Sequence, residues 1–155
     1  GICQAANDND PSQVVISGER AAVELAIELA KNNGAKRAIM LPVSAPFHCE
    51  LMAPAAEKMK IELEAIKIKP PTVPIVSNVS AQAISDPTEI KKLLVSQVTG
   101  SVRWRESIIW MAKNNVDEIW EIGSGKALSG MIRRIDKNIN LVTISSPEDI
   151  RTVNL

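Results

Sequence analysis

Aromatic residues are scarce in this 155-residue chain, which has no tyrosine, one phenylalanine and three tryptophans. Modules that bind single-stranded nucleic acid stack bases on aromatic side chains, so this scarcity argues against such a function. A net charge is lacking as well, because 18 basic residues balance 18 acidic ones. A neutral chain gives no electrostatic reason to expect nucleic acid or an anionic membrane as a partner.

Long apolar runs and metal-ligand motifs are also missing. No run is long and apolar enough to span a bilayer, and no signal peptide is visible at the start. The two cysteines, Cys3 and Cys49, form no CxxC pattern, which is typical of a reducing, cytoplasmic setting. The only histidine, His48, has no second ligand at metal-binding spacing, so we expect no metal and no cofactor.

What the chain does contain is an alternation of strand and helix patterns. Strands are predicted at residues 13–17, 37–43, 72–78, 116–122 and 140–144. Helices are predicted at residues 19–33, 52–66, 86–98, 101–115 and 126–135. The peptide DPTE at residues 86–89 offers an N-cap acid, a proline at the first helical position and a glutamate at the third. Residues 1–12 show no such pattern, and the alternation predicts a mostly parallel α/β sheet.

His48 is the strongest candidate for a catalytic residue. It lies in a loop directly after the strand predicted at residues 37–43, and open α/β sheets place their sites at the carboxyl ends of strands. Imidazole exchanges protons near neutral pH, which suits a general base. A lone histidine is more often an ordinary surface or core residue, so the local pattern leaves both interpretations open.

Other patterns carry less weight on local grounds. The GSG turn at residues 123–125 is a candidate anion cradle, but it matches neither a Walker A loop nor GxGxxG. The nucleophile elbow GxSxG occurs nowhere in the chain. Cys49 is a candidate thiol nucleophile, although adjacent residues rarely face each other as a catalytic pair. Asn9 and Gln97 read as a turn residue and a helix-end residue.

Five motifs, taken together and in order, resemble the family of malonyl-CoA:acyl-carrier-protein transacylases. They are "NDNDPSQVVISG", "GAKRAIMLPVSAPFHCELMAPAAEKM", "PTVPIVSNV", "SQVTGSVRW" and "EIGSGKALSGMIRRI". The resemblance implies an α/β-hydrolase-like parallel sheet core with an inserted ferredoxin-like small subdomain. Residues 1–43 would be the C-terminal part of the small subdomain, and residues 44–155 the C-terminal part of the acyltransferase core.

The resemblance also implies a two-step transfer. A serine attacks malonyl-CoA to form a malonyl ester, and the phosphopantetheine thiol of acyl carrier protein then takes the malonyl group. His48 matches the family's base, and Gln97 matches the position whose backbone carbonyl orients that base in place of an acid. Asn9 matches an asparagine near the acyl group. Phe47 resembles the malonyl-selective form of the site, where a bulky ring crowds an α-methyl branch.

Three functional residues of the family have no counterpart in the chain: the nucleophilic serine, the arginine that pairs with the malonyl carboxylate, and a glutamine of the oxyanion hole. All three precede the part of the family that Gly1 matches. We therefore expect a C-terminal fragment that is inactive without the missing N-terminal half. Two alternatives stay open: a non-catalytic fragment that binds acyl carrier protein or CoA, and the acyltransferase part of a polyketide-type synthase.

Overall fold

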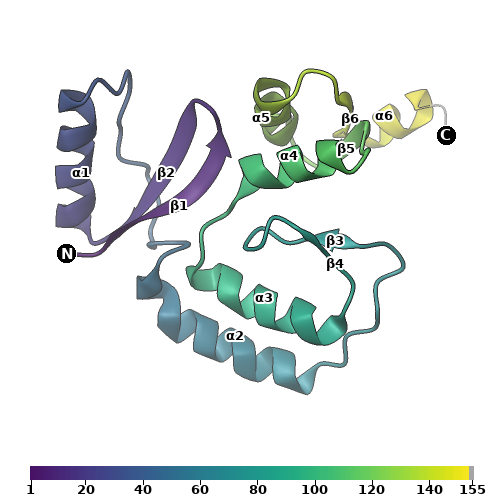
Figure 1. Cartoon of the computed structure of the whole chain (residues 1–155), viewed down its shortest axis with the longest axis horizontal. Helices are drawn as coiled ribbons and strands as arrows, with labels where there is room; N and C mark the ends of the chain where they lie inside the picture. Colours follow the sequence, from purple (N-terminus) through teal and green to yellow (C-terminus); the bar gives the residue numbers. More distant parts are fainter. Residues whose placement is uncertain (154–155) are drawn as a thin grey trace.

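The computed structural model describes residues 1–153 and shows an α/β chain with three two-stranded sheets (Figure 1). In chain order the elements are β1 (Cys3–Asp10), β2 (Gln13–Gly18), α1 (Arg20–Asn32), the 3-10 helix η1 (Glu50–Met52), α2 (Ala53–Ala65), β3 (Ile75–Val76), β4 (Ala83–Ile84), α3 (Pro87–Thr99), α4 (Trp104–Lys113), β5 (Glu118–Ile122), α5 (Ala127–Ile135), β6 (Asn140–Ile144) and α6 (Pro147–Thr152). Figure 1 shows three groups: α1 with the β1–β2 hairpin, α2 with α3 and the β3–β4 hairpin, and α4 to α6 with β5 and β6.

The predicted helices are confirmed, and their ends follow from local chemistry. The clearest start is that of α3, where the Asp86 carboxylate accepts hydrogen bonds from the backbone N–H groups of Thr88 at 2.6 Å and Glu89 at 3.4 Å. These two groups have no partner inside the helix, so the N-cap side chain satisfies donors that would otherwise need water. Helix α6 is an addition that the sequence pattern did not indicate.

The prediction of a mostly parallel sheet is wrong for the described residues. Within residues 1–153, β5 and β6 form the only parallel pair of strands, and β1–β2 and β3–β4 are antiparallel hairpins. Alternating strands and helices imply parallel pairing only where each strand returns to the same sheet through a crossover. The sequence pattern did not predict β1 or β4. Each of them pairs antiparallel with a predicted strand, β1 with β2 and β4 with β3.

The lack of a strand pattern before residue 13 is misleading, because β1 occupies residues 3–10. Its sequence, CQAANDND, is rich in asparagine and aspartate, which rarely occur in strands. The hairpin turn compensates: the Asp10 carboxylate accepts hydrogen bonds from the backbone N–H of Ser12 at 2.8 Å and from its hydroxyl at 2.7 Å. The ladder is interrupted between Ala5 and Asn7 and again between Asp8 and Asp10. Residues 6 and 9 are therefore bulged.

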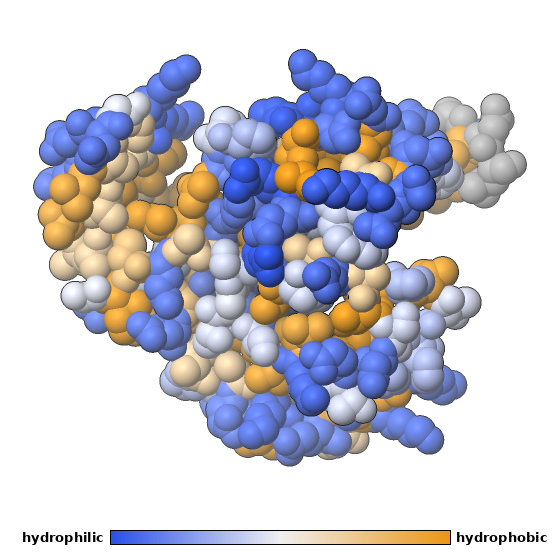
Figure 2. Space-filling model, in the orientation of Figure 1, coloured by the Kyte–Doolittle hydropathy of each residue, from blue (hydrophilic) through white to orange (hydrophobic). Residues whose placement is uncertain are grey.

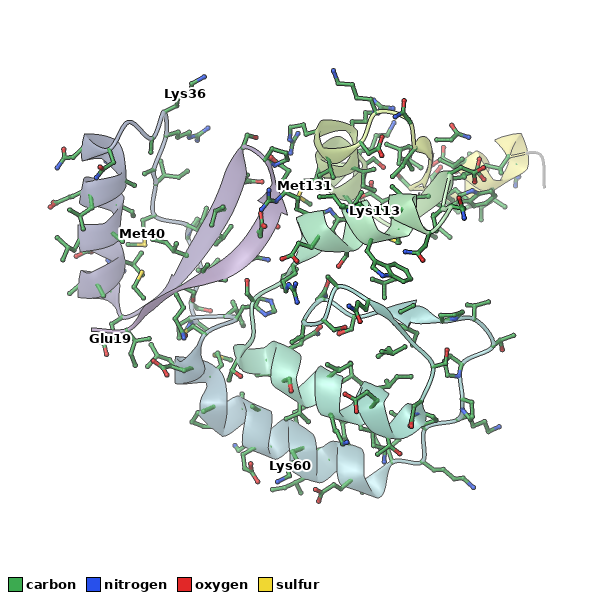
Figure 3. The ribbon with its side chains drawn as sticks, viewed as in Figure 1. Glu19, Lys36, Met40, Lys60, Lys113 and Met131 are labelled. Carbon is green, nitrogen blue, oxygen red and sulfur yellow. The ribbon has the colours of Figure 1, made fainter. Side chains whose placement is uncertain are left out.

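The strand predicted at residues 37–43 does not form among the described residues. The segment has no ladder, although its side chains Ile39, Met40, Leu41 and Val43 suit a strand and are 43–62% exposed. Met40 lies beside α1 in Figure 3 and lines a hollow together with Ile27 of that helix. An extended segment becomes a strand only where a neighbour accepts its backbone hydrogen bonds, and residues 1–153 supply none here.

The best-packed part of the chain lies between α4, α5 and the β5–β6 pair. Ile108, Ile132 and Ile139 are at most 7% exposed, and Trp104 and Met111 pack against them.

Elsewhere many large apolar side chains are exposed, and Figure 2 shows apolar groups over α1 and near the centre of the face drawn. Apolar surface of this extent marks places where another surface packs. No helix within residues 1–153 has both the length and the apolarity needed to cross a bilayer.

Candidate active site

His48 lies in a tightly fixed turn between exposed Phe47 and buried Cys49. Its φ of +58° falls in the left-handed region, which is uncommon for a residue with a side chain. Such a conformation costs of order 1–3 kcal/mol and persists only where surrounding contacts enforce it. The Cys49 thiol, fully buried, donates to the carbonyl oxygen of Pro46 at 3.2 Å, and the Cys49 carbonyl accepts from the backbone N–H of Met52 at 3.0 Å. These contacts hold the histidine in place.

The imidazole of His48 is oriented by the last turn of α3. Its Nδ1 lies 2.9 Å from the backbone carbonyl oxygen of Gln97. The last four carbonyl groups of a helix have no partner inside it, which leaves this oxygen free to accept. A carbonyl can only accept, so Nδ1 carries the proton and Nε2 holds the free lone pair.

This arrangement suits an imidazole that takes up a proton during a reaction. The carbonyl end of a helix carries a partial negative charge, which stabilises a cation placed against it by about 0.3–1 kcal/mol and more where the site is partly buried. The Gln97 carbonyl can fix the tautomer of His48, which is one of the roles of the carboxylate in a serine–histidine–acid triad. The structure therefore brings together His48 and Gln97, both identified from the sequence.

The side chain of Gln97 has a partner that sequence reasoning did not identify. Its Oε1 accepts a hydrogen bond from the amide nitrogen of Asn78 at 3.3 Å, and the Asn78 carbonyl accepts from the backbone N–H of Arg103 at 3.0 Å. Arg103 in turn donates from Nη1 to the carbonyl oxygens of Val79 and Ser80. The loop after β3 is thereby attached to the end of α3 and the start of α4. No local signal distinguishes Asn78 in the sequence, because its partners lie 19 and 25 residues away.

Strand β1 is attached to both sides of this region. At its start, the Gln4 side-chain oxygen accepts the backbone N–H of Glu50, two residues after His48, at 2.8 Å. In its middle, the backbone carbonyl of Ala6 accepts from the N–H of Val102 at 2.8 Å, and the Val102 carbonyl accepts from the N–H of Asp8 at 2.9 Å. Val102 follows Gln97 by five residues. The stretch from Gln97 in the last turn of α3 to Val102 therefore contacts His48 at one end and β1 at the other.

The two remaining candidate residues are placed less directly. Asn9 is the bulged residue near the end of β1 and is half-buried, and no hydrogen bond joins its side chain to His48 or Gln97 among residues 1–153. Phe47 is 50% exposed, next to His48 in the chain. The described part of the chain contains no group of three or more histidine, cysteine, aspartate or glutamate residues that could hold a metal ion.

Cys49 is a poor candidate for a nucleophile. Its side chain is completely buried and its thiol is engaged by the Pro46 carbonyl, so no substrate can approach the sulfur in this arrangement. A cysteine enclosed in this way is typical of an inert structural residue. Its contribution is to fix the turn that presents His48.

Comparisons with curated proteins and with solved structures agree with one another. No family model matches the chain. The malonyl CoA-acyl carrier protein transacylase of Bacillus subtilis is 49% identical over 149 residues, which are 96% of this chain and 47% of that protein. The crystal structure of an acyl-carrier-protein S-malonyltransferase from Bartonella henselae is 54% identical with a TM-score of 0.94, over 98% of this chain and 48% of that one. A malonyl-transacylase solved in complex with a type II polyketide synthase acyl-carrier protein is 38% identical with a TM-score of 0.94, over 97% of this chain and 49% of that one.

These matches confirm the resemblance read from the five motifs. The chain spans about half the length of the curated relatives it matches.

Proposed function

We propose that this chain forms part of an enzyme that moves a malonyl group from CoA to an acyl carrier protein. The chain belongs with the malonyl CoA-acyl carrier protein transacylases over the half of their length that it spans. The contact between His48 Nδ1 and the Gln97 carbonyl at 2.9 Å is the observation that carries the proposal. It presents Nε2 as an unprotonated base, on the residue that the family motif marks.

In the proposed reaction, His48 Nε2 takes the proton of a serine hydroxyl while that oxygen attacks the thioester carbonyl of malonyl-CoA. CoA leaves as a thiol after receiving that proton, and a malonyl-serine ester remains. The phosphopantetheine thiol then gives its proton to His48, and its sulfur attacks the ester to form a malonyl thioester. The serine oxygen leaves with the proton from His48, which restores the hydroxyl. This chain contains no GxSxG elbow, so the serine is assigned to the part of the enzyme outside it. No step requires a cofactor.

We further propose that residues 1–43 belong to a small ferredoxin-like subdomain and residues 44–155 to a hydrolase-like core. Two observations support the division. Within residues 1–153, the apolar segment at residues 38–43 joins no ladder and β2 pairs with β1 alone, so both leave backbone groups open to a further strand. In addition, β5–β6 is a parallel pair, as such a core requires. A solved structure of the complete protein in which residues 38–43 pair with no strand would contradict this assignment.

Two kinds of carrier protein are proposed as the acceptor of the malonyl group, one from fatty-acid synthesis and one from polyketide synthesis. One structural relative was solved with a polyketide carrier protein, whereas the curated relatives carry only the general name. The catalytic geometry is common to both. Comparing transfer rates to a fatty-acid and a polyketide carrier protein distinguishes them, and the faster acceptor identifies the pathway class.

Trapping the acyl-enzyme tests the proposed function directly. The complete protein, incubated with malonyl-CoA and no acceptor, should gain the mass of one malonyl group on a serine outside this chain. Added carrier protein should remove it. A stable malonyl group on a residue of this chain would mean that the nucleophile has been misplaced, and no adduct together with no transfer would refute the proposal.

Phe47 is proposed to select malonyl over methylmalonyl groups. Its ring is half exposed and it precedes His48 in the chain, which supports a place at the acyl site. One methyl group is worth about 1–3 kcal/mol in such discrimination. Phe47→Ala in the complete protein should therefore raise the relative kcat/KM for methylmalonyl-CoA by roughly tenfold or more. The check is competition between the two thioesters, followed by mass analysis of the loaded carrier protein. An unchanged ratio would remove Phe47 from the acyl site.

A further inference from the structure

We propose that Asp8 and Arg105 are positioning residues for malonyl transfer, because their ion pair fixes the bulge that carries Asn9. This inference rests on the proposed function and on the assignment of Asn9 to the acyl site. It adds two residues to which the resemblance assigns no role: Asp8, on β1 within the motif NDNDPSQVVISG, and Arg105, in the first turn of α4.

The pair has the geometry of a specific contact. Arg105 Nε lies 3.0 Å from each carboxylate oxygen of Asp8, and Nη2 lies 2.7 Å from Oδ2. The Asp8 side chain is 23% exposed and that of Arg105 is 42% exposed. Charge pairs at this exposure contribute little to folding stability, whereas a planar guanidinium that contacts both carboxylate oxygens restricts orientation strongly. The pair is therefore better suited to fixing a position than to stabilising the fold.

The position that it fixes is that of Asn9. Asp8 pairs with Val14 across the hairpin and Asp10 pairs with Gln13, which leaves Asn9 with no partner in the ladder. A bulged residue is held only by its two neighbours, and bulges next to active sites commonly serve to redirect a side chain. Both neighbours of Asn9 are held by arginines on separate helices: Asp8 by Arg105 of α4, and Asp10 by Arg134 of α5 at 2.9 Å.

The stretch of chain from Gln97 to Arg105 links this bulge to His48. Helix α4 begins at Trp104, two residues after Val102, whose backbone bonds hold the middle of β1, and seven residues after Gln97, whose carbonyl holds His48. Arg105 thus ties the bulge to the same stretch of chain that orients the imidazole. Loss of this contact would leave His48 and the backbone bond from Asp8 to Val102 in place, but it would remove the side-chain contact that orients one side of the bulge. A shift of about 1 Å in a group that positions a substrate can lower a rate by about a hundredfold.

The test is a double-mutant cycle in the complete protein. Asp8→Asn keeps the side-chain size and Arg105→Gln shortens the side chain, and each removes one charge. Both variants are compared with Asn9→Ala and with Asp8→Asn combined with Asn9→Ala. Glu24→Gln is the matched control, since it also removes one charge from an ion pair, but that pair is the exposed one with Arg20 on α1 and contacts neither Asp8 nor Arg105. The readouts are kcat and KM for malonyl transfer to a carrier protein, and the thermal unfolding midpoint.

We expect Asp8→Asn and Arg105→Gln each to lower kcat/KM by roughly tenfold with little change in the unfolding midpoint. In the Asn9→Ala background, Asp8→Asn should add less than about twofold, since residues that act through one group are not additive. The control should stay within about twofold, as surface substitutions do. Equal losses in both backgrounds, or no loss from either single variant, would overturn the inference while leaving the proposed function intact. A wild-type protein that transfers no malonyl group would instead refute the function itself. If Asp8→Asn fails to fold, Arg105→Gln with Asn9→Ala gives the same cycle.

Discussion

Replacing His48 by alanine in the complete protein should lower malonyl transfer by about a thousandfold, since a positioned general base contributes roughly 10²–10⁴-fold. The reason lies in the contact between Nδ1 and the Gln97 carbonyl, which leaves Nε2 as the only free proton acceptor on this ring. In the proposed reaction, loss of this acceptor slows proton removal from both the serine hydroxyl and the phosphopantetheine thiol. The measurement is the steady-state rate of carrier-protein loading, together with the rate at which the malonyl-serine ester forms.

Gln97→Ala provides the contrast. The carbonyl that holds His48 belongs to the backbone, so this variant keeps the orienting contact and loses only the side-chain bond to Asn78. The expected loss is several-fold at most, comparable to one neutral hydrogen bond of about 1 kcal/mol. If Gln97→Ala is as damaging as His48→Ala, the carbonyl account is wrong. If His48→Ala transfers malonyl at the wild-type rate, His48 is not the base.

The parts of this site that the sequence predicted are those with a local or motif signal. The start of α3 follows from Asp86 and the three residues after it, and the structure shows the expected cap. His48 and Gln97 were identified through motifs, and their contact agrees with the roles that the motifs imply. The approach of two residues 49 positions apart could not be read from local periodicity, because it depends on how α2 and α3 pack.

Other parts had no signal that a single sequence could show. Strand β1 is composed of residues that disfavour strands, and it exists because Asp10 closes the turn and β2 pairs with it. Residues 38–43 show the opposite case: their composition favours a strand, yet no neighbour within residues 1–153 completes it. Gln4 and Asn78 contribute through partners far away in the chain. In each case tertiary pairing, rather than local preference, decides the outcome.

Asp10→Ala should destabilise the complete protein by about 3 kcal/mol at pH 7, the low end of the range for breaking a buried ion pair. Asp10 is 1% exposed, and its carboxylate accepts hydrogen bonds from Arg134 and from the backbone and hydroxyl of Ser12. The low end applies because the Arg134 side chain is 50% exposed and can regain water when its partner is removed. Urea unfolding at pH 7 measures the change. Glu24→Gln, which breaks the exposed Arg20–Glu24 pair on α1, should stay within about 1 kcal/mol.

The pH dependence of this difference gives a sharper test. Burial alone raises the pKa of the Asp10 carboxyl, but the hydrogen bonds from Arg134 and Ser12 outweigh burial and lower the pKa from 3.8 to about 2. A carboxyl with a lowered pKa stabilises the folded state fully above its unfolded pKa, and this share is lost as pH falls through the folded value. At about 1.4 kcal/mol for each pKa unit, the lowered pKa of Asp10 contributes about 2 kcal/mol to the free energy of unfolding.

The stability gap between wild type and Asp10→Ala should therefore stay constant from pH 7 to about pH 5 and then narrow by about 2 kcal/mol as the pH approaches 2. Every other titrating group is common to both proteins, so their contributions cancel in the difference. About 1 kcal/mol should remain at low pH, where a protonated Asp10 still packs and still bonds to Ser12. A gap that does not change with pH would mean that the carboxyl is not held by Arg134 as the structure shows. The hairpin end beside Asn9 would then be attached through backbone contacts and Asp8 alone.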